Sequence, residues 1–135
     1  VEANTMQIEL NKFSMSDFGI PYCYSPVIIA RNNKVVTNKN DYSIFIKATQ
    51  RGYSYAVENK SKSVKILKEY LTDYDKANID VIESLEITAP YFGNEKKCGF
   101  MKPERVNTFL KWLVKNKLEN EKIIEQNLFT NNLLK

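Results

Sequence analysis

Hydrophobic and polar residues follow two different periods along the chain. Near the start, MQIEL (Met6–Leu10) alternates with a period of two, and SPVIIA (Ser25–Ala30) is a short apolar run rich in β-branched residues. Both patterns predict strands, and a run without polar alternation is typical of a strand covered on both faces. Because the chain offers this strand only one candidate neighbour, its partners would come from other sequence or from a second copy.

From about residue 40 the period changes to 3.6 and predicts helices. Asp41 can begin a helix that carries Ile44, Phe45 and Ala48 on one stripe. This helix contains Gly52, which lowers helix stability by roughly 1 kcal/mol relative to Ala. We therefore expect that a second helix packs closely against this position, where a larger side chain would not fit.

Further helices are predicted to begin at Ser61 and at Asp75, the latter ending before Pro90 because a residue before proline is pushed out of helical geometry. Lys102–Lys117 reads as an amphipathic helix, since Pro103 suits a first turn and Glu104 favours the positive helix N-terminus. A last short helical segment would hold Ile123 and Ile124. The prediction is a mainly helical chain with about four or five helices between residues 40 and 126.

Composition indicates one globular domain: the chain has 135 residues, of which 43% are hydrophobic. The net charge is +4, and basic and acidic residues are interspersed along the chain. Because no basic face is evident, the charge pattern gives nucleic-acid binding little support. No apolar run is long enough to cross a bilayer, and no leader stands at the start. Since the sequence begins at Val1 in mid-pattern, we expect it to be a piece of a longer protein.

The residue types that most catalytic and metal sites use are scarce. Cys23 and Cys98 lie far apart and the chain has no histidine, so neither a zinc site nor Cys-His chemistry is expected. A disulfide is one interpretation of the two cysteines, and two buried free thiols are the favoured one. We expect no catalytic residue, no metal and no cofactor.

Four motifs in this order resemble a known family. They are GIPYCYSPVIIA, then FIKATQRGYSYAVEN, then a loop and helix containing MKPER, and finally NLFTNNLL. Together they resemble the C-terminal part of the solute-binding proteins of bacterial ABC importers, and more narrowly the family that binds pyrimidine precursors of thiamine. The resemblance implies a type II periplasmic-binding-protein fold, an α/β architecture of two lobes that clamp ligand between them. This segment would be mainly helical with one or two strands, residues 1–15 ending the distal lobe and hinge and residues 16–135 forming the return strand and helices of the proximal lobe.

The same resemblance suggests three ligand-binding residues. Tyr24, and with it Tyr22, would line the cleft and stack on a flat heteroaromatic ligand, while Glu2 would accept a hydrogen bond from an exocyclic amine. The competing interpretation is that the tyrosines pack at a strand entrance and that Glu2 is a solvated carboxylate. The chain departs from the family pattern at Tyr22 and Cys23, where relatives tend to have Asp and Tyr, and these departures bear on the identity of the ligand.

The resulting functional hypothesis is a fragment of the solute-binding component of an ABC importer. It would bind a thiamine pyrimidine precursor or a similar compound, would not be an enzyme, and would meet an ABC permease in an extracytoplasmic, membrane-associated setting as a lipoprotein or periplasmic protein. The alternative is a freestanding helical interaction protein that binds an acidic partner or nucleic acid. The uncovered run Val27–Ala30 also suggests that the fragment forms a homodimer through this strand.

Overall fold

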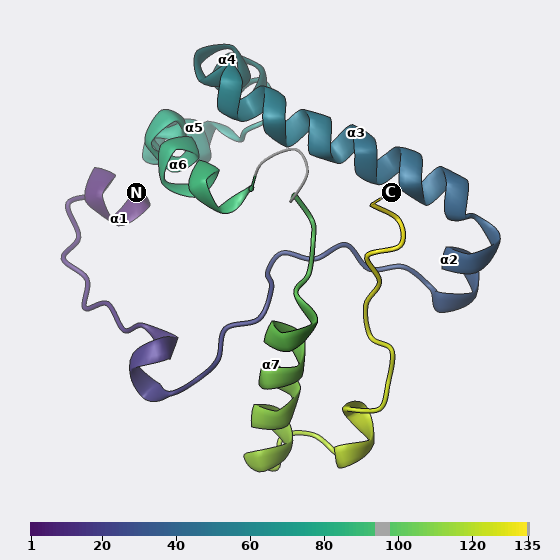
Figure 1. The fold of residues 1–135 in the computed structure, drawn as a ribbon. Helices are drawn as coiled ribbons and strands as arrows, with labels where there is room; N and C mark the ends of the chain where they lie inside the picture. The colour runs from purple at the N-terminus through teal and green to yellow at the C-terminus, as the bar shows by residue number, and fades with distance from the viewer. Residues whose placement is uncertain (94–97, 135) are drawn as a thin grey trace. The chain divides into compact units, whose positions relative to one another are not determined.

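The computed structural model describes residues 1–93 and 98–134 and is mainly helical (Figure 1). Within these residues the elements are α1 (Glu2–Thr5), η1 (Met15–Phe18), α2 (Asn32–Thr37), α3 (Lys39–Glu58), α4 (Lys60–Lys68), α5 (Asp73–Asn78), α6 (Val81–Thr88), η2 (Ala89–Tyr91), α7 (Pro103–Lys115) and η3 (Glu121–Ile123), where η denotes a 3₁₀ helix. The prediction of a mainly helical chain is therefore confirmed.

The two predicted strands are wrong, because no strand occurs in the described part of the chain. Residues 6–10 follow the short helix α1 as a turn and irregular chain, and residues 25–30 are irregular too. The exposed fractions of Val27, Ile28 and Ile29 are 52%, 61% and 87%. A strand exists only when its backbone is paired with a second one. The run therefore has strand-like composition without a partner that would make it a strand.

The helix predicted from Asp75 is instead two short helices. The Thr72 hydroxyl accepts a hydrogen bond from the Asp75 N–H at 3.1 Å, which begins α5. The Asp80 carboxylate accepts the N–H groups of Ile82 and Glu83, both at 3.0 Å, and so begins α6. A strong N-cap inside the predicted helix starts a new helix there, since its side chain satisfies backbone donors that would otherwise be unpaired.

Other helix boundaries shift by a few residues. α3 begins before Asp41, which lies in its first turn, and α6 is continued past the predicted stop by η2, with Pro90 in the first turn. The close contact expected at Gly52 is wrong, because among the described residues no atom outside its chain neighbours and its own helix backbone would lie within 4 Å of a Cβ at this position. α7 matches its prediction closely, and the last predicted segment is η3.

The chain divides into two compact units. The first consists of residues 1–11 and 45–99 and the second of residues 12–44 and 100–135. In the first unit α4 packs on α6, with Val64 and Val81 buried between neighbours and a Lys60–Glu86 ion pair of 3.7 Å at the edge. The Gln50 amide of α3 donates a hydrogen bond to the Cys98 carbonyl at 2.8 Å, so α3 is joined to the end of this unit.

In the second unit α7 is the central element. Its residues Val106 and Leu110 are buried, as is Leu133 near the end of the chain. The Asn131 side chain makes two hydrogen bonds to the backbone of Met101. Its Oδ1 accepts a hydrogen bond from the Met101 N–H at 3.0 Å, and its Nδ2 donates one to the Met101 carbonyl at 2.8 Å. The C-terminal segment is thus fixed to the residue that leads into α7.

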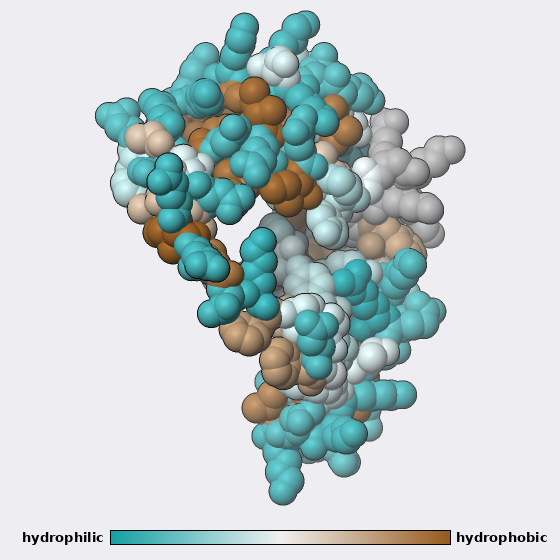
Figure 2. Space-filling model, turned by 90° about the vertical axis from the view of Figure 1, so that its left-hand side faces the viewer, coloured by the Kyte–Doolittle hydropathy of each residue, from teal (hydrophilic) through white to brown (hydrophobic). Residues whose placement is uncertain are grey.

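Much hydrophobic surface stays open to solvent. Six hydrophobic residues of the described chain are buried, whereas large apolar side chains are exposed along most elements, and hydrophobic groups are visible among hydrophilic ones on the face drawn in Figure 2. An excess of exposed apolar side chains is typical of a surface that another chain segment or a partner covers.

Candidate functional site

The candidate site begins at a tight turn that ends η1. Gly19 closes this 3₁₀ helix in the left-handed conformation, with φ of 66°, and its N–H donates to the Ser16 carbonyl at 3.0 Å. A residue with a side chain adopts this conformation at a cost of about 1–2 kcal/mol. The chain then runs through Ile20 and Pro21 into the two tyrosines predicted to bind ligand.

Tyr24 is held by the start of α7. Its hydroxyl oxygen accepts a hydrogen bond from the Lys102 N–H at 2.9 Å, and Lys102 is the N-cap residue directly before this helix. Backbone donors at a helix start have no intrahelical acceptor, so an oxygen supplied from elsewhere stabilises both partners. Half-buried Tyr24 is therefore fixed at both ends, by its own backbone and by its hydroxyl group.

Tyr22 is more exposed and is tied to the same helix through its backbone. Its hydroxyl donates to the Ser25 carbonyl at 3.2 Å, while its own carbonyl accepts a hydrogen bond from Arg105 Nε at 3.0 Å. Tyr22 and Tyr24 are thus brought together at the first turn of α7.

Arg105 joins the two rings. Its guanidinium carbon lies 4.7 Å from the ring centroid of Tyr24 and 5.2 Å from that of Tyr22, within the range of cation–π interactions. At an exposed site such a contact contributes about 0.5–1 kcal/mol. The tyrosine–arginine cluster, as we call Tyr22, Tyr24 and Arg105, is an aromatic surface with a permanent positive charge upon it.

Sequence reasoning did not assign Arg105 to the site. The residue closes the Met101-x-Pro-Glu-Arg motif, which contributed to the family resemblance only as a helix start. That motif was the available signal for Arg105. The partners of Arg105, Tyr22 and Tyr24, lie 83 and 81 positions earlier in the chain, so a local sequence pattern could not pair Arg105 with them.

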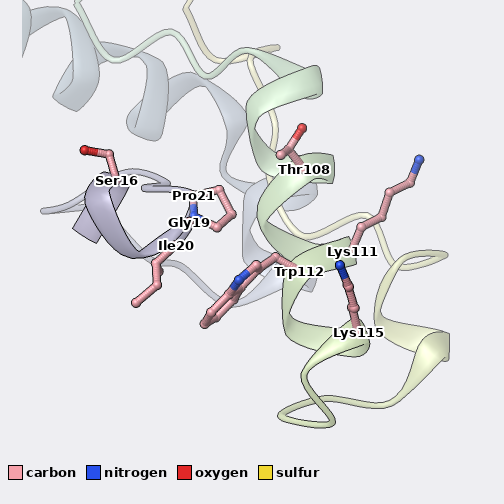
Figure 3. Close-up of a pocket in the computed structure, with 8 residues that line it drawn as sticks. All are labelled: Ser16, Gly19, Ile20, Pro21, Thr108, Lys111, Trp112 and Lys115. Atoms are coloured by element: carbon pink, nitrogen blue, oxygen red, sulfur yellow. The ribbon is translucent and has the colours of Figure 1, made fainter. Parts of the chain in front are cut away.

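A shallow groove of ≈ 470 Å³ adjoins the cluster in the same unit (Figure 3). One wall is the turn around Gly19, and the other is the face of α7 that continues from Arg105; the lining residues are Ser16, Gly19, Ile20, Pro21, Thr108, Lys111, Trp112 and Lys115. Figure 3 shows the Trp112 side chain extending from α7 toward Ile20. None of the cluster residues lines the groove, but Pro21 directly precedes Tyr22 and Thr108 lies one turn beyond Arg105, so the two features are neighbours along both segments.

Glu2, the third predicted residue, belongs to the first unit. It lies in α1, is exposed, and its Oε1 accepts a hydrogen bond of 3.3 Å from the Tyr74 hydroxyl at the start of α5. The structure thus brings together Tyr22 and Tyr24 and places Glu2 in a separate unit, beside another tyrosine.

Both cysteines are free thiols, as favoured from the sequence, but Cys23 is half-buried and not buried as predicted. Cys98 is buried, and its loss of solvent raises the pKa of the thiol above its ordinary value, because burial disfavours the charged thiolate. Within residues 1–93 and 98–134 there is no group of His, Cys, Asp and Glu side chains that could hold a metal ion. Nor does any helix in these ranges have the length and apolarity needed to cross a membrane.

Comparison with known proteins finds a family to which the first part of the chain is similar. Residues 1–63 match the family described as NMT1/THI5 like. The NMT1/THI5-like match confirms the resemblance to thiamine-precursor-binding solute-binding proteins, and it contains Glu2, Tyr22 and Tyr24 but ends before α7.

A curated protein is similar to more than half of the chain. A formylaminopyrimidine-binding protein of Halalkalibacterium halodurans is 28% identical to the chain over 78 residues. These residues are 58% of this chain and 23% of the relative, so the match spans less than a quarter of that protein. No solved structure matches the chain. The helical content fits a fragment of an α/β binding protein, while the two-lobe type II fold stays a prediction.

Proposed function

We propose that this chain is part of a solute-binding protein that binds a small heteroaromatic compound related to the pyrimidine precursors of thiamine. The observation that carries the proposal is the tyrosine–arginine cluster beside an open groove. Two of its three residues, Tyr22 and Tyr24, are those that the family resemblance had marked for ligand binding. The family match and the formylaminopyrimidine-binding relative support the same class of ligand.

The chemistry of the cluster suits a flat ring. Tyr24 is held at its hydroxyl, so its ring presents a fixed aromatic surface, and offset stacking on such a surface contributes about 0.5–1.5 kcal/mol beyond the burial of area. The groove next to it has a volume within the usual range for small-molecule sites, about 300–1,000 Å³. Glu2 would accept a hydrogen bond from an exocyclic amine, for which it would leave its contact with Tyr74.

Binding, and not catalysis, is the proposed activity, because the named relative is a binding protein and the chain has no histidine to act as an acid or base near neutral pH. In the complete protein, two lobes of a type II fold would close on the ligand. An ABC permease would receive the ligand outside the cytoplasm, where a lipoprotein or periplasmic protein resides.

Substitution of Tyr24 tests the proposal. The 135-residue chain is titrated with 4-aminopyrimidine, and binding is followed by ligand-observed NMR, which detects weak complexes. Tyr24→Ala should weaken binding by about 1 kcal/mol or more, which is roughly fivefold or more in Kd, because the ring surface is lost. Tyr24→Phe keeps the ring but loses the hydrogen bond from the Lys102 N–H, so its affinity should lie between those of Tyr24→Ala and the parent.

The matched control is Tyr91→Ala, which removes an exposed tyrosine ring from the first unit, where the side chain is 86% exposed. This variant should retain the affinity of the parent. Equal affinities for Tyr24→Ala and the parent would exclude Tyr24 from the site, and no binding to the parent would contradict the proposed function.

A further inference from the structure

One face of α3 is open to solvent along its C-terminal half. A hollow of ≈ 520 Å³ lies on this face, and the residues that line it are Ala48, Arg51, Gly52, Ser54, Tyr55 and Glu58. All of them belong to α3 and to the first unit, and all except Ser54 are exposed. Residues three and four positions apart lie on the same side of a helix, so the hollow follows the helix axis.

This face combines a gap with a bulky ring. The gap is at Gly52, since apart from its chain neighbours and its own helix backbone no described atom would lie within 4 Å of a Cβ there. Tyr55 lies about one turn further along the same face and is 45% exposed. The face is therefore complementary to itself: a second copy with its helix reversed would place each Tyr55 on the Gly52 of the other.

Arg51 and Glu58 carry opposite charges on one edge of the same face. They are two helical turns apart, about 10 Å along the axis, and neither forms an ion pair among the described residues. A two-fold operator that reverses the helix keeps this edge against itself and inverts the order of the charges. Arg51 of each copy then lies opposite Glu58 of the other. In a parallel pair each residue would be level with its own copy, so the charges favour the antiparallel arrangement.

The ring contact and the charge contact agree on one register. When Tyr55 of one copy is level with Gly52 of the other, Arg51 and Glu58 of opposite copies are offset by two residues, about 3 Å along the axis. Arginine and glutamate side chains are long enough to cover this offset. Because α3 ends at Glu58, the two helices would overlap by about ten residues, or about 15 Å. Such an overlap is short for a protein interface and predicts weak association.

We propose that this face of α3 is a self-association surface. Its occupant is a second copy of the chain, packed antiparallel, with Tyr55 on Gly52 and with Arg51 paired to Glu58 in both directions. The two ion pairs select the antiparallel partner more than they add affinity. The inference does not depend on the proposed function, and it concerns a different surface from the run Val27–Ala30.

The first test mixes two charge-reversal variants of the 135-residue chain, Arg51→Glu and Glu58→Arg. Each variant alone would form a homodimer with two like-charge pairs, whereas one copy of each would form a heterodimer with two opposite-charge pairs. Every sample also carries Ile28→Lys, so that the exposed run Val27–Ala30 contributes little. Native mass spectrometry at low ionic strength separates the three dimers by mass. We expect heterodimers in about tenfold excess over their statistical share, and added salt should reduce the excess.

The second test fills the gap. Gly52→Leu meets no obstacle within the chain and replaces a poor helix former, so circular dichroism should show equal or higher thermal stability. Sedimentation should show association weakened about tenfold or more, because Tyr55 of the second copy would have no room. The matched control is Ala77→Leu, which adds an apolar side chain at an exposed position on α5 and should leave association unchanged.

The double variant Arg51→Glu/Glu58→Arg restores opposite charges across the pair and should associate like its parent. Dimers in their statistical ratio would overturn the inference, because the charges would then not meet across the interface. Stronger association of Gly52→Leu would also overturn it, since a larger apolar surface would then matter more than the fit. A parent that stays monomeric would overturn it outright, while the proposed ligand binding would be unaffected.

Discussion

Asn131 is expected to stabilise the start of α7 more than any other polar side chain of the C-terminal segment. Its amide makes two hydrogen bonds to the backbone of Met101, at 3.0 and 2.8 Å, in a partly buried position. A hydrogen bond contributes about 1 kcal/mol net, so Asn131→Ala should lower the free energy of local opening by about 2 kcal/mol. By the same conversion the Met101 amide should exchange its hydrogen roughly 30-fold faster.

Amide hydrogen exchange followed by NMR measures this effect, and the chain offers a matched control at the next position. Asn132 is exposed, and its side chain has no hydrogen bond among the described residues. Asn132→Ala should therefore leave exchange at Met101 unchanged. Asn131→Asp keeps the oxygen that accepts the Met101 N–H but loses the donor to its carbonyl, so its effect should lie between those of the parent and Asn131→Ala.

The reasoning would be refuted if Asn131→Ala and Asn132→Ala changed exchange at Met101 by the same factor. An equal effect would mean that the C-terminal segment is held by the burial of Leu133 alone and that the paired hydrogen bonds add nothing measurable.

Two further predictions concern the thiols and the open apolar run. At neutral pH iodoacetamide should modify Cys98 more slowly than Cys23, since burial raises the pKa of Cys98 and reduces its reactive thiolate; mass spectrometry of the labelled chain checks this, and equal rates would contradict it. The chain should associate at micromolar concentration through Val27–Ala30, and Ile28→Lys should weaken association while Val36→Lys, at another exposed position, should not. Sedimentation of the parent as a clean 15.7 kDa monomer would exclude this dimer.

The helices were predictable where local chemistry and hydrophobic period agree. α7 has proline in its first turn, an acidic residue beside it and a regular apolar stripe, and its bounds differ from the prediction by two residues or fewer. The division between α5 and α6 was missed because Ile79 and Ile82 fit one continuous stripe. The Asp80 cap, a local hydrogen-bonding preference, outweighs that stripe.

The strands and Arg105 could not be predicted for a common reason, since both depend on residues distant in sequence. The composition of residues 25–30 fits a buried strand, but only a partner strand can make it one. The tyrosines were predicted from family resemblance, whereas Arg105 reaches them only through the packing of α7 against residues 22–24. Residues 94–97 of the predicted loop lie outside the described residues.

The two hydrogen bonds between Asn131 and Met101 have a thermodynamic consequence for the candidate site. The Met101 carbonyl and the Lys102 N–H belong to the same peptide group, whose carbonyl accepts a hydrogen bond from the Asn131 amide and whose N–H donates to the Tyr24 hydroxyl. If ordering one attachment favours the other, linkage requires the two effects to be equal in free energy. A ligand that orders Tyr24 would then also order the segment around Asn131. Loss of this segment would weaken the binding of that ligand by the same factor.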